Sequence, residues 1–155
     1  MKDKKGANQS TEYVIYFFIT TMLILLFIDI ILAFFSVYQT HVTASSVARV
    51  ISINGGYDTI EDNNIVDSYD LYAYAQKQLE NRMDDPDTLI ITITDKNGEH
   101  VLTASEKSDT YSVDLGEEFT VRVEEKIPFV RLANVPINIT VSSTSSGVSE
   151  VYHKS

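Results

Sequence analysis

One acidic side chain, Asp29, lies deep inside an otherwise apolar stretch that runs from Tyr13 to Val37. A stretch of this length can cross a bilayer as a tilted helix. A carboxylate inside such a helix costs about 3 kcal/mol or more unless a partner accepts or neutralises it. The chemistry predicted for Asp29 is therefore pairing with another polypeptide, through hydrogen bonds or an ion pair within the membrane.

Small and hydroxylated residues share the helical face of Asp29. At about 100° per residue, five positions fall within about 40° of it: Ala33, Ser36, Thr40, Thr43 and Val47. Stripes of this kind are used when helices associate in lipid, so Ser36 and Thr40 join Asp29 as predicted contacts to a partner helix. Two alternatives stay open: Asp29 is protonated and passive, or it lies near enough to the outer interface for water to reach it.

A second carboxylate, Glu12, stands just before the apolar stretch, and Gly6 and Ala7 lie between it and the basic pair Lys4-Lys5. This order resembles the class III signal sequences of type IV filament subunits, most closely those of tight-adherence (Tad) pilins and TadE-like pseudopilins. The resemblance implies cleavage between Gly6 and Ala7 by a prepilin peptidase. It also implies that Glu12 pairs with the new N-terminal amine of a neighbouring subunit, which is physically sound for a carboxylate entering lipid.

The resemblance has one departure, because Glu12 would be the sixth residue after the cut and those proteins have their glutamate fifth. The plainer reading is that Gly6 is part of a flexible lead-in and Glu12 merely sits at the interface. Beyond the leader, the order of elements and the closing segment 147–152 resemble uncharacterised Gram-positive single-pass proteins encoded near Tad-type pilus genes. The functional interpretation of the stripe with Asp29, Ser36 and Thr40 is a contact with the helix of another pilin or pseudopilin subunit, or with an assembly-platform protein.

The element that positions these residues is one long helix, predicted from about Thr11 to Ile53. Its upper half has apolar residues at helical spacing, namely Ala44, Val47, Ala48 and Ile51, and it ends at Asn54-Gly55-Gly56. The chain divides into a cytoplasmic leader (1–12), a transmembrane helix (13–38) and an extracytoplasmic domain (39–155). This orientation follows from three lysines before the helix and no comparable cluster after it.

The extracytoplasmic part is predicted to be α+β and pilin-like. A second, short helix begins near Asp67 or Ser68, with an apolar stripe of Tyr72, Ala75, Leu79 and Met83. The period then changes to two, which predicts a mostly antiparallel sheet of about four or five strands with a hairpin turn at residues 95–98. A segment bounded by two prolines, residues 127–136, is predicted to be a crossover loop, with an exposed apolar edge that contacts a neighbour as the alternative.

Composition excludes several classes of function. The formal net charge is −10, and the first 38 residues contain three basic and three acidic residues, so the acidity belongs to the domain. An acidic domain disfavours nucleic acid. The three histidines stand in separate elements, and the acidic run near residues 58–70 lacks the spacing of a calcium loop. We therefore predict no enzyme, no metal and no cofactor.

The sequence as a whole predicts a single-pass cell-membrane protein that works as a non-enzymatic minor pilin or pseudopilin. Its partners would be the membrane, other subunits, an assembly platform and a prepilin peptidase. A membrane-anchored sensing or binding module with no filament role is the main alternative. Release by a signal peptidase after Ala44 is disfavoured, because the apolar stretch is about twice the usual length for a signal peptide.

Overall fold

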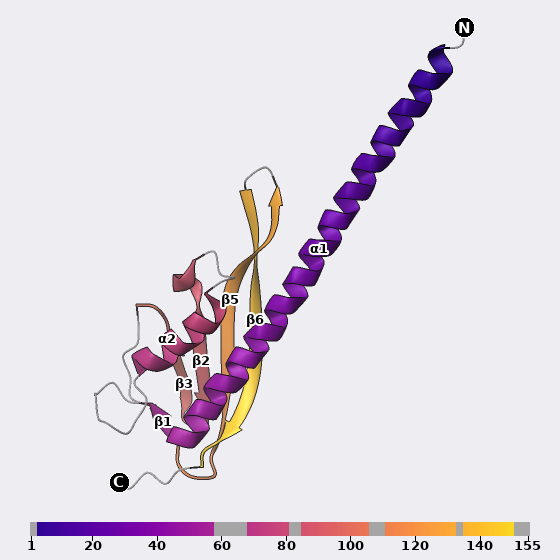
Figure 1. Ribbon diagram of the computed structural model, residues 1–155. Coiled ribbons are helices and arrows are strands. Elements are labelled where there is room, and N and C mark those ends of the chain that lie inside the picture. Colours follow the sequence, from indigo (N-terminus) through magenta and orange to yellow (C-terminus); the bar gives the residue numbers. More distant parts are fainter. Residues whose placement is uncertain (1–2, 58–67, 81–84, 106–110, 133–134, 151–155) are drawn as a thin grey trace.

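A computed structural model describes residues 3–57, 68–80, 85–105, 111–132 and 135–150 (Figure 1). The chain forms one very long helix, one short helix and two antiparallel sheets, an α+β fold as predicted. In chain order the elements are α1 (Asp3–Asn54), β1 (Gly56–Tyr57), α2 (Ser68–Leu79), the 3-10 turn η1 (Pro86–Thr88), β2 (Ile90–Asp95), β3 (Gly98–Leu102), β4 (Tyr111–Ser112), β5 (Glu118–Leu132) and β6 (Val135–Val148).

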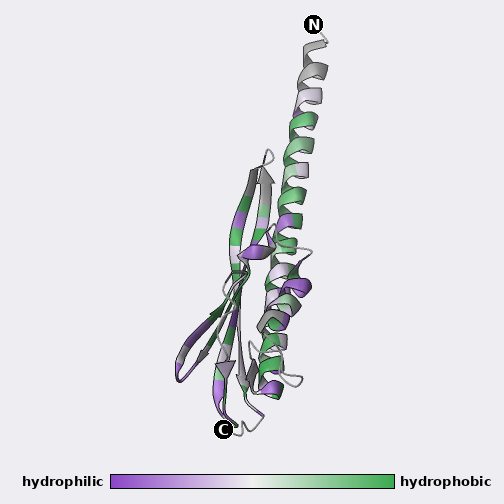
Figure 2. Ribbon diagram, turned by 90° about the vertical axis from the view of Figure 1, so that its left-hand side faces the viewer, coloured by the Kyte–Doolittle hydropathy of each residue, from purple (hydrophilic) through white to green (hydrophobic). Residues whose placement is uncertain are grey.

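Helix α1 is continuous over 52 residues, which corresponds to about 78 Å. No glycine or proline interrupts it between Ala7 and Asn54. Its N-terminal half projects alone and is apolar, whereas its C-terminal half packs on the sheet (Figures 1 and 2). The helix starts eight residues before the predicted Thr11, so Gly6 and Ala7 lie in its first turns.

The end of α1 follows the predicted glycine signal. Gly55 adopts a φ of 71° and its N–H donates to the Ile51 carbonyl at 2.8 Å, which is the left-handed cap that a glycine allows. The Ser52 carbonyl, which the helix itself leaves without a donor, accepts from the N–H of Glu150 at 2.9 Å. The last turn of α1 is thus tied to the chain just after β6.

The main sheet has the strand order β3-β2-β5-β6, and a separate two-stranded sheet pairs β1 with β4. Strand β2 pairs with β5 only from Ile90↔Glu124 to Thr94↔Thr120. Strands β5 and β6 continue as a hairpin for eight more residues of β5, to Leu132↔Val135. In Figures 1 and 2 this distal part of the hairpin extends past the rest of the domain, along α1 toward the N-terminus.

Both helices cover one face of the main sheet (Figure 2). Arg122 and Glu124 alternate along β5 with the buried Val121 and Val123, so they lie on the opposite face. The core lies between the two layers. From the helices it takes the predicted stripes, namely Ala44, Val47, Ala48 and Ile51 of α1 with Leu71, Tyr72, Ala75 and Leu79 of α2. Each fully buried aliphatic side chain contributes about 1.5–3 kcal/mol. The predicted stripe residue Met83 lies outside the described residues.

The sequence prediction for segment 127–136 was wrong. Segment 127–136 is no crossover loop: it contains the end of β5 and the start of β6, and the ladder tolerates Pro128 because a register shift falls between Pro128 and Val130. Residues 142–147, which are mostly serine and threonine, are part of β6. Although Tyr111, Val113 and Leu115 alternate with polar residues, only Tyr111 lies in a strand, because β4 is two residues long.

Candidate interaction surface on the first helix

The N-terminal half of α1 is exposed along its whole circumference. The side chains from Tyr13 to Ile28 are all exposed, and by length and composition this helix can cross a membrane. Surface of this extent and apolarity marks a contact with lipid or with another protein. Glu12 stands at the start of this surface and is itself exposed. Gly6 and Ala7 lie one to two turns earlier in the same helix; their side chains are outside the described set.

Asp29 marks the first position at which α1 stops being exposed on every side. Asp29, Ile30 and Ala33 are half-buried, whereas Ile31, Leu32 and their other neighbours remain exposed. The next residues on the same face, Ser36 and Thr40, are buried. The predicted small-residue stripe is therefore real, and it is the face that α1 turns toward the β5–β6 hairpin.

Ser36 and Thr40 make their contacts within this chain. Ser36 is 7% exposed and Thr40 is 0% exposed, and both pack under the sheet. In this chain they therefore lie against its own hairpin, and their contact with a partner helix stays a prediction. The physical reason is that small side chains favour close approach to any packed surface, and here that surface is the chain's own hairpin.

Glu125 of β5 is a buried acidic residue that the sequence analysis did not identify. It is 0% exposed, and Thr40 Oγ1 lies 2.5 Å from its Oε1 while also reaching the Ser36 carbonyl at 2.9 Å. The sequence does contain a signal for this burial. Glu125 belongs to the series of alternate residues along β5 whose other members are apolar, namely Val121, Val123 and Ile127. An acidic residue in the apolar phase of a strand predicts a buried carboxylate that needs a donor.

The Thr40–Glu125 contact gives a first stability prediction. Thr40→Val keeps the shape of the side chain but removes the hydroxyl that faces a buried carboxylate, so the free energy of unfolding should fall by about 1.5–3 kcal/mol. The measurement is urea unfolding of the full chain in detergent, followed by near-ultraviolet circular dichroism of its nine tyrosines.

Thr43→Val is the matched control for Thr40→Val. Thr43 is equally buried, but its hydroxyl meets a neutral amide, Gln78 Oε1, at 3.3 Å. This variant should lose about 1 kcal/mol or less. Equal losses for the two variants would show that the carboxylate adds nothing to the Thr40 contact.

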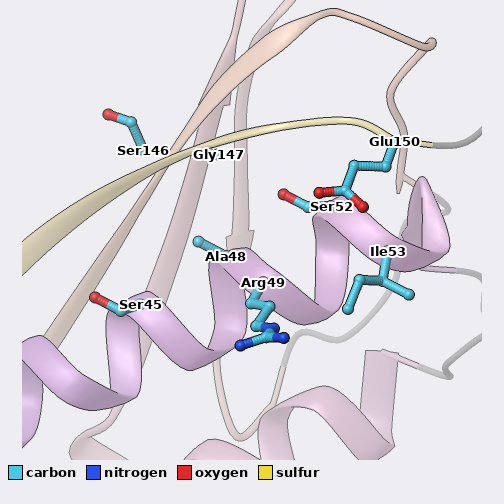
Figure 3. A pocket seen from close by; sticks show the side chains of 8 residues that line it. All are labelled: Ser45, Ala48, Arg49, Ser52, Ile53, Ser146, Gly147 and Glu150. Atoms are coloured by element: carbon cyan, nitrogen blue, oxygen red, sulfur yellow. The ribbon is translucent and has the colours of Figure 1, made fainter.

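A hollow of about 360 Å³ lies between the last turns of α1 and β6 (Figure 3). Its lining combines one basic and one acidic residue with small ones: Ser45, Ala48, Arg49, Ser52, Ile53, Ser146, Gly147 and Glu150. It is open and shallow, and its only titratable residues are Arg49 and Glu150. The small residues of its lining allow α1 to approach β6 closely. The lining does not present a pair of groups suited to general acid–base catalysis.

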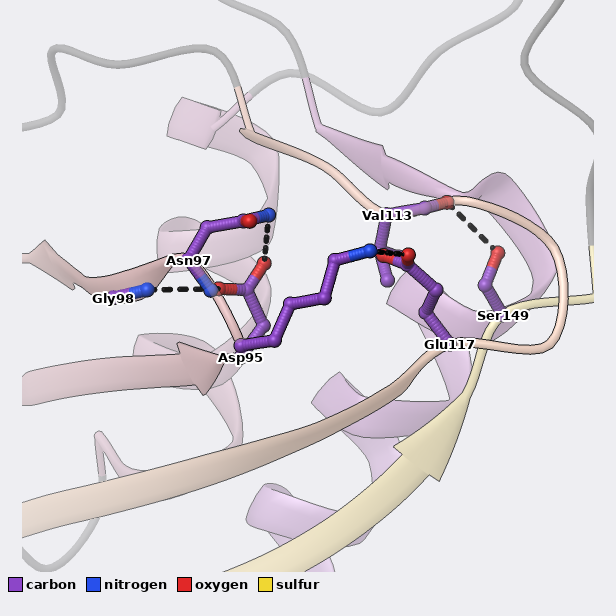
Figure 4. A network of polar contacts seen from close by, with 7 residues as sticks. Asp95, Asn97, Gly98, Val113, Glu117 and Ser149 are labelled. Carbon is purple, nitrogen blue, oxygen red and sulfur yellow. Dashed lines mark hydrogen bonds and ion pairs between the residues drawn. The ribbon is translucent and has the colours of Figure 1, made fainter.

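A polar network closes the same end of the sheet (Figure 4). Asp95 accepts from the N–H groups of Asn97 and Gly98 at 2.6 and 3.0 Å, which forms the predicted hairpin turn, and Lys96 pairs with Glu117. Ser149 Oγ donates to the Val113 carbonyl at 3.0 Å. These contacts satisfy backbone N–H and carbonyl groups at turns and strand ends, so we assign them a structural role.

Two of the three histidines are described, and they lie in separate places. His41 is exposed and its Nδ1 is 3.1 Å from Ser143 Oγ of β6, while His100 packs its ring against Tyr111. Burial raises the pKa of the Tyr111 phenol above its usual value of 10.0, and the negative charge of Asp95 acts in the same direction. Within the described ranges, no three His, Cys, Asp or Glu residues gather in a way that could hold a metal ion.

Comparison with known proteins gives one family. A family model with the description "Domain of unknown function (DUF4320)" matches residues 17–154, which is most of the chain. No curated protein matches the chain significantly, and no solved structure does.

Proposed function

This chain belongs to the DUF4320 family, and we propose that it is a non-enzymatic minor pilin or pseudopilin subunit of a Tad or type IV-related filament system. The observation that carries the proposal is the build of α1. An exposed apolar half continues without a break into a half that packs on the chain's own antiparallel sheet. Such a helix presents one end for lateral association and holds a folded domain at the other.

The contact surface in this proposal is the exposed part of α1. Glu12 would pair with the N-terminal amine that cleavage creates on Ala7 of a neighbouring subunit, as the resemblance of the leader implies. The apolar side chains from Tyr13 onward would pack against other subunits' helices and against an assembly-platform protein. Asp29 is half-buried and would use its exposed part for a neighbour, whereas Ser36 and Thr40 are buried against the chain's own hairpin.

Processing by the prepilin peptidase gives the decisive test. When the chain is produced together with the matching peptidase, mass spectrometry of the membrane-extracted protein should find an N-terminus at Ala7. Gly6→Leu should abolish this cleavage, because the peptidase recognises the small residue before the cut. Intact Met1 in the native chain, or a start at Ser45, would contradict the proposal.

Ser10→Leu is the control for Gly6→Leu, since it adds the same side chain to the same helix beyond the cut. It should leave processing intact. The pair also separates this proposal from a membrane-anchored sensing module, whose level and location would be indifferent to both changes.

A further inference from the structure

Strand β6 is one edge of the main sheet, and residues 142–148 of it have no strand on their outer side among the described elements. The helix-facing side chains show how the cover over the sheet thins at this edge. Val121 and Val123 of β5 are buried, whereas their partners on β6, Ser145 and Ser143, are only half-buried. The outer side of β6 is therefore open along this stretch.

Every second residue of β6 directs its backbone groups to the open side. The N–H of Ser149 donates to the Glu117 carbonyl at 3.0 Å, one step beyond the last β5–β6 pair, so Ser149 faces β5. The N–H of Glu150 instead donates to the Ser52 carbonyl of α1, away from β5. Because the two directions alternate along an antiparallel strand, four residues present N–H and C=O groups outward: Ser142, Thr144, Ser146 and Val148.

This edge lacks the features that usually prevent pairing with another chain. Natural edge strands are kept short, or are protected by charged side chains, proline or bulges. The opposite edge, β3, is five residues long and carries Glu99. Strand β6 is 14 residues long and contains no charged residue, and its pairing with β5 has no register shift from residue 138 to residue 148. β6 is therefore built like a strand that another strand covers.

Charge favours a second copy of this chain as the covering partner. The chain has a formal net charge of −10, so two copies repel each other where their acidic residues meet. The segment 142–148 contains only serine, threonine, glycine and valine, so two copies can meet there without like charges in contact. Two copies anchored side by side by α1 are also held at a high local concentration, which supports a contact of few hydrogen bonds.

Strand direction decides how two such copies can pair. Helix α1 and strand β6 both run from the end where the apolar half of α1 projects toward the end that holds the C-terminus (Figure 1). An antiparallel pair of β6 strands would point the two apolar halves in opposite directions, and they could not enter one membrane. A parallel pair keeps both apolar halves on the same side.

Pairing of β6 with β3 of the second copy fits a common membrane poorly. Neighbouring strands are rotated by about 20–25°, so a copy that continues the sheet from its β3 would be turned by roughly 80–100° over four strands. Its α1 would turn by the same angle. The parallel β6 pair has a two-fold axis along the strands instead, which is the commonest symmetry of dimers, and it places the two α1 helices on opposite faces of the joined sheet.

We propose that residues 142–148 of β6 pair in parallel with the same residues of a second copy, so that two subunits share one continuous sheet. The inference deepens the proposed function and rests on its membrane-anchored subunit, since it names a copy of this chain as the lateral partner. The hollow between α1 and β6 lies beside Ser146 and Gly147, so α1 does not fill the helix-facing side of this edge.

Distances between identical labels on two copies distinguish the ways of pairing, because the chain contains no cysteine of its own. Nitroxides would be attached to three separate full-length variants, Ser142→Cys, Thr144→Cys and Ser146→Cys, whose positions are all exposed. Double electron–electron resonance in vesicles of phosphatidylethanolamine and phosphatidylglycerol should give nearly the same distance at all three positions. Arg122→Cys is the matched control: it is exposed at the level of Thr144 but on β5, so its distance should be longer.

Thr144→Pro, combined with the Ser142 label, gives a second measurement. It removes an N–H that points at the partner and not at β5, so it should abolish the distance between copies while near-ultraviolet circular dichroism stays unchanged.

Distances that change steeply from position to position would overturn the parallel pair in favour of an antiparallel one. No distance between copies, with the chain folded in the vesicles, would overturn the contact itself. Both failures leave cleavage between Gly6 and Ala7 untouched, so they are distinct from a failure of the proposed function. Equal distances in a chain that the peptidase does not cleave would support the edge contact and count against the pilin role.

Discussion

Gly56→Ala should unfold the junction between α1 and the domain, with a loss of about 4 kcal/mol or more in the free energy of unfolding. Gly56 adopts a φ of 135°, which L side chains rarely reach, and a β-carbon there would lie 2.0 Å from the Tyr111 carbonyl oxygen. Gly56 and Tyr111 both lie in backbone that is paired in the β1–β4 sheet, so neither segment can move away at low cost. The β1–β4 pair would separate, and the buried rings of Tyr57 and Tyr111 would lose their packing.

Gly98→Ala is the matched control for Gly56→Ala. Gly98 has a similar φ of 146°, but nothing lies within 4 Å of the position that a β-carbon would take. Gly98→Ala should therefore lower the free energy of unfolding only through backbone strain, by about 1–3 kcal/mol. Urea unfolding of the two variants by tyrosine circular dichroism makes the comparison. A Gly56→Ala protein no less stable than Gly98→Ala would refute the clash with Tyr111.

Gly147→Val should loosen α1 from the sheet. Gly147 has ordinary backbone angles, but a β-carbon would come within 2.5 Å of Phe119 Cζ and 2.9 Å of Ser52 Oγ. The ring of Phe119 is buried, so the helix must shift away from β6 where Ser52 lies against Gly147 (Figure 3). Overpacking of this kind costs about 1–3 kcal/mol. The expected readout is a lower urea midpoint together with faster proteolysis at the end of α1.

Two further variants sharpen the Gly147 prediction. Ser146→Val introduces the same side chain one position earlier, on the exposed face of β6, and should change stability by about 0.5 kcal/mol or less. Combining Gly147→Ala with Ser52→Ala removes one of the two clashing atoms and should recover part of the loss that Gly147→Ala causes alone. Equal behaviour of Gly147→Val and Ser146→Val would contradict the close approach.

The elements were predicted correctly from the sequence wherever apolar residues kept a single helical or strand-like period along the whole segment. The stripe from Ala44 to Ile51 and the alternation of Ile91 and Ile93 each point to one buried face, and the structure buries them. Gly55 and the turn at residues 95–98 were readable because their chemistry is local. The long β5–β6 hairpin was missed, because Pro128 argues against a ladder and a bulge that accommodates it leaves no local signal.

The candidate site was harder to predict, because it depends on what lies opposite each residue. Ser36 and Thr40 have the composition of an interface between helices, and no local pattern tells whether the opposing surface belongs to the same chain. Glu125 could have been noticed as a charge in an apolar phase, but its partner Thr40 stands 85 residues away. The assembly roles of Glu12 and Asp29, and processing between Gly6 and Ala7, stay predictions.

The unbroken course of α1 has a mechanical consequence. Kinks in helices arise at proline, glycine or inserted side chains, and from Ala7 to Asn54 the helix has neither of those two residue types. In the proposed membrane-anchored subunit, a pull on the domain would therefore be transmitted along a stiff rod with no joint between the packed and the apolar half of α1. The apolar half of such a subunit would leave the bilayer as one piece, so a machine that extracts it would have to supply the work of that transfer at once or offer another apolar surface alongside.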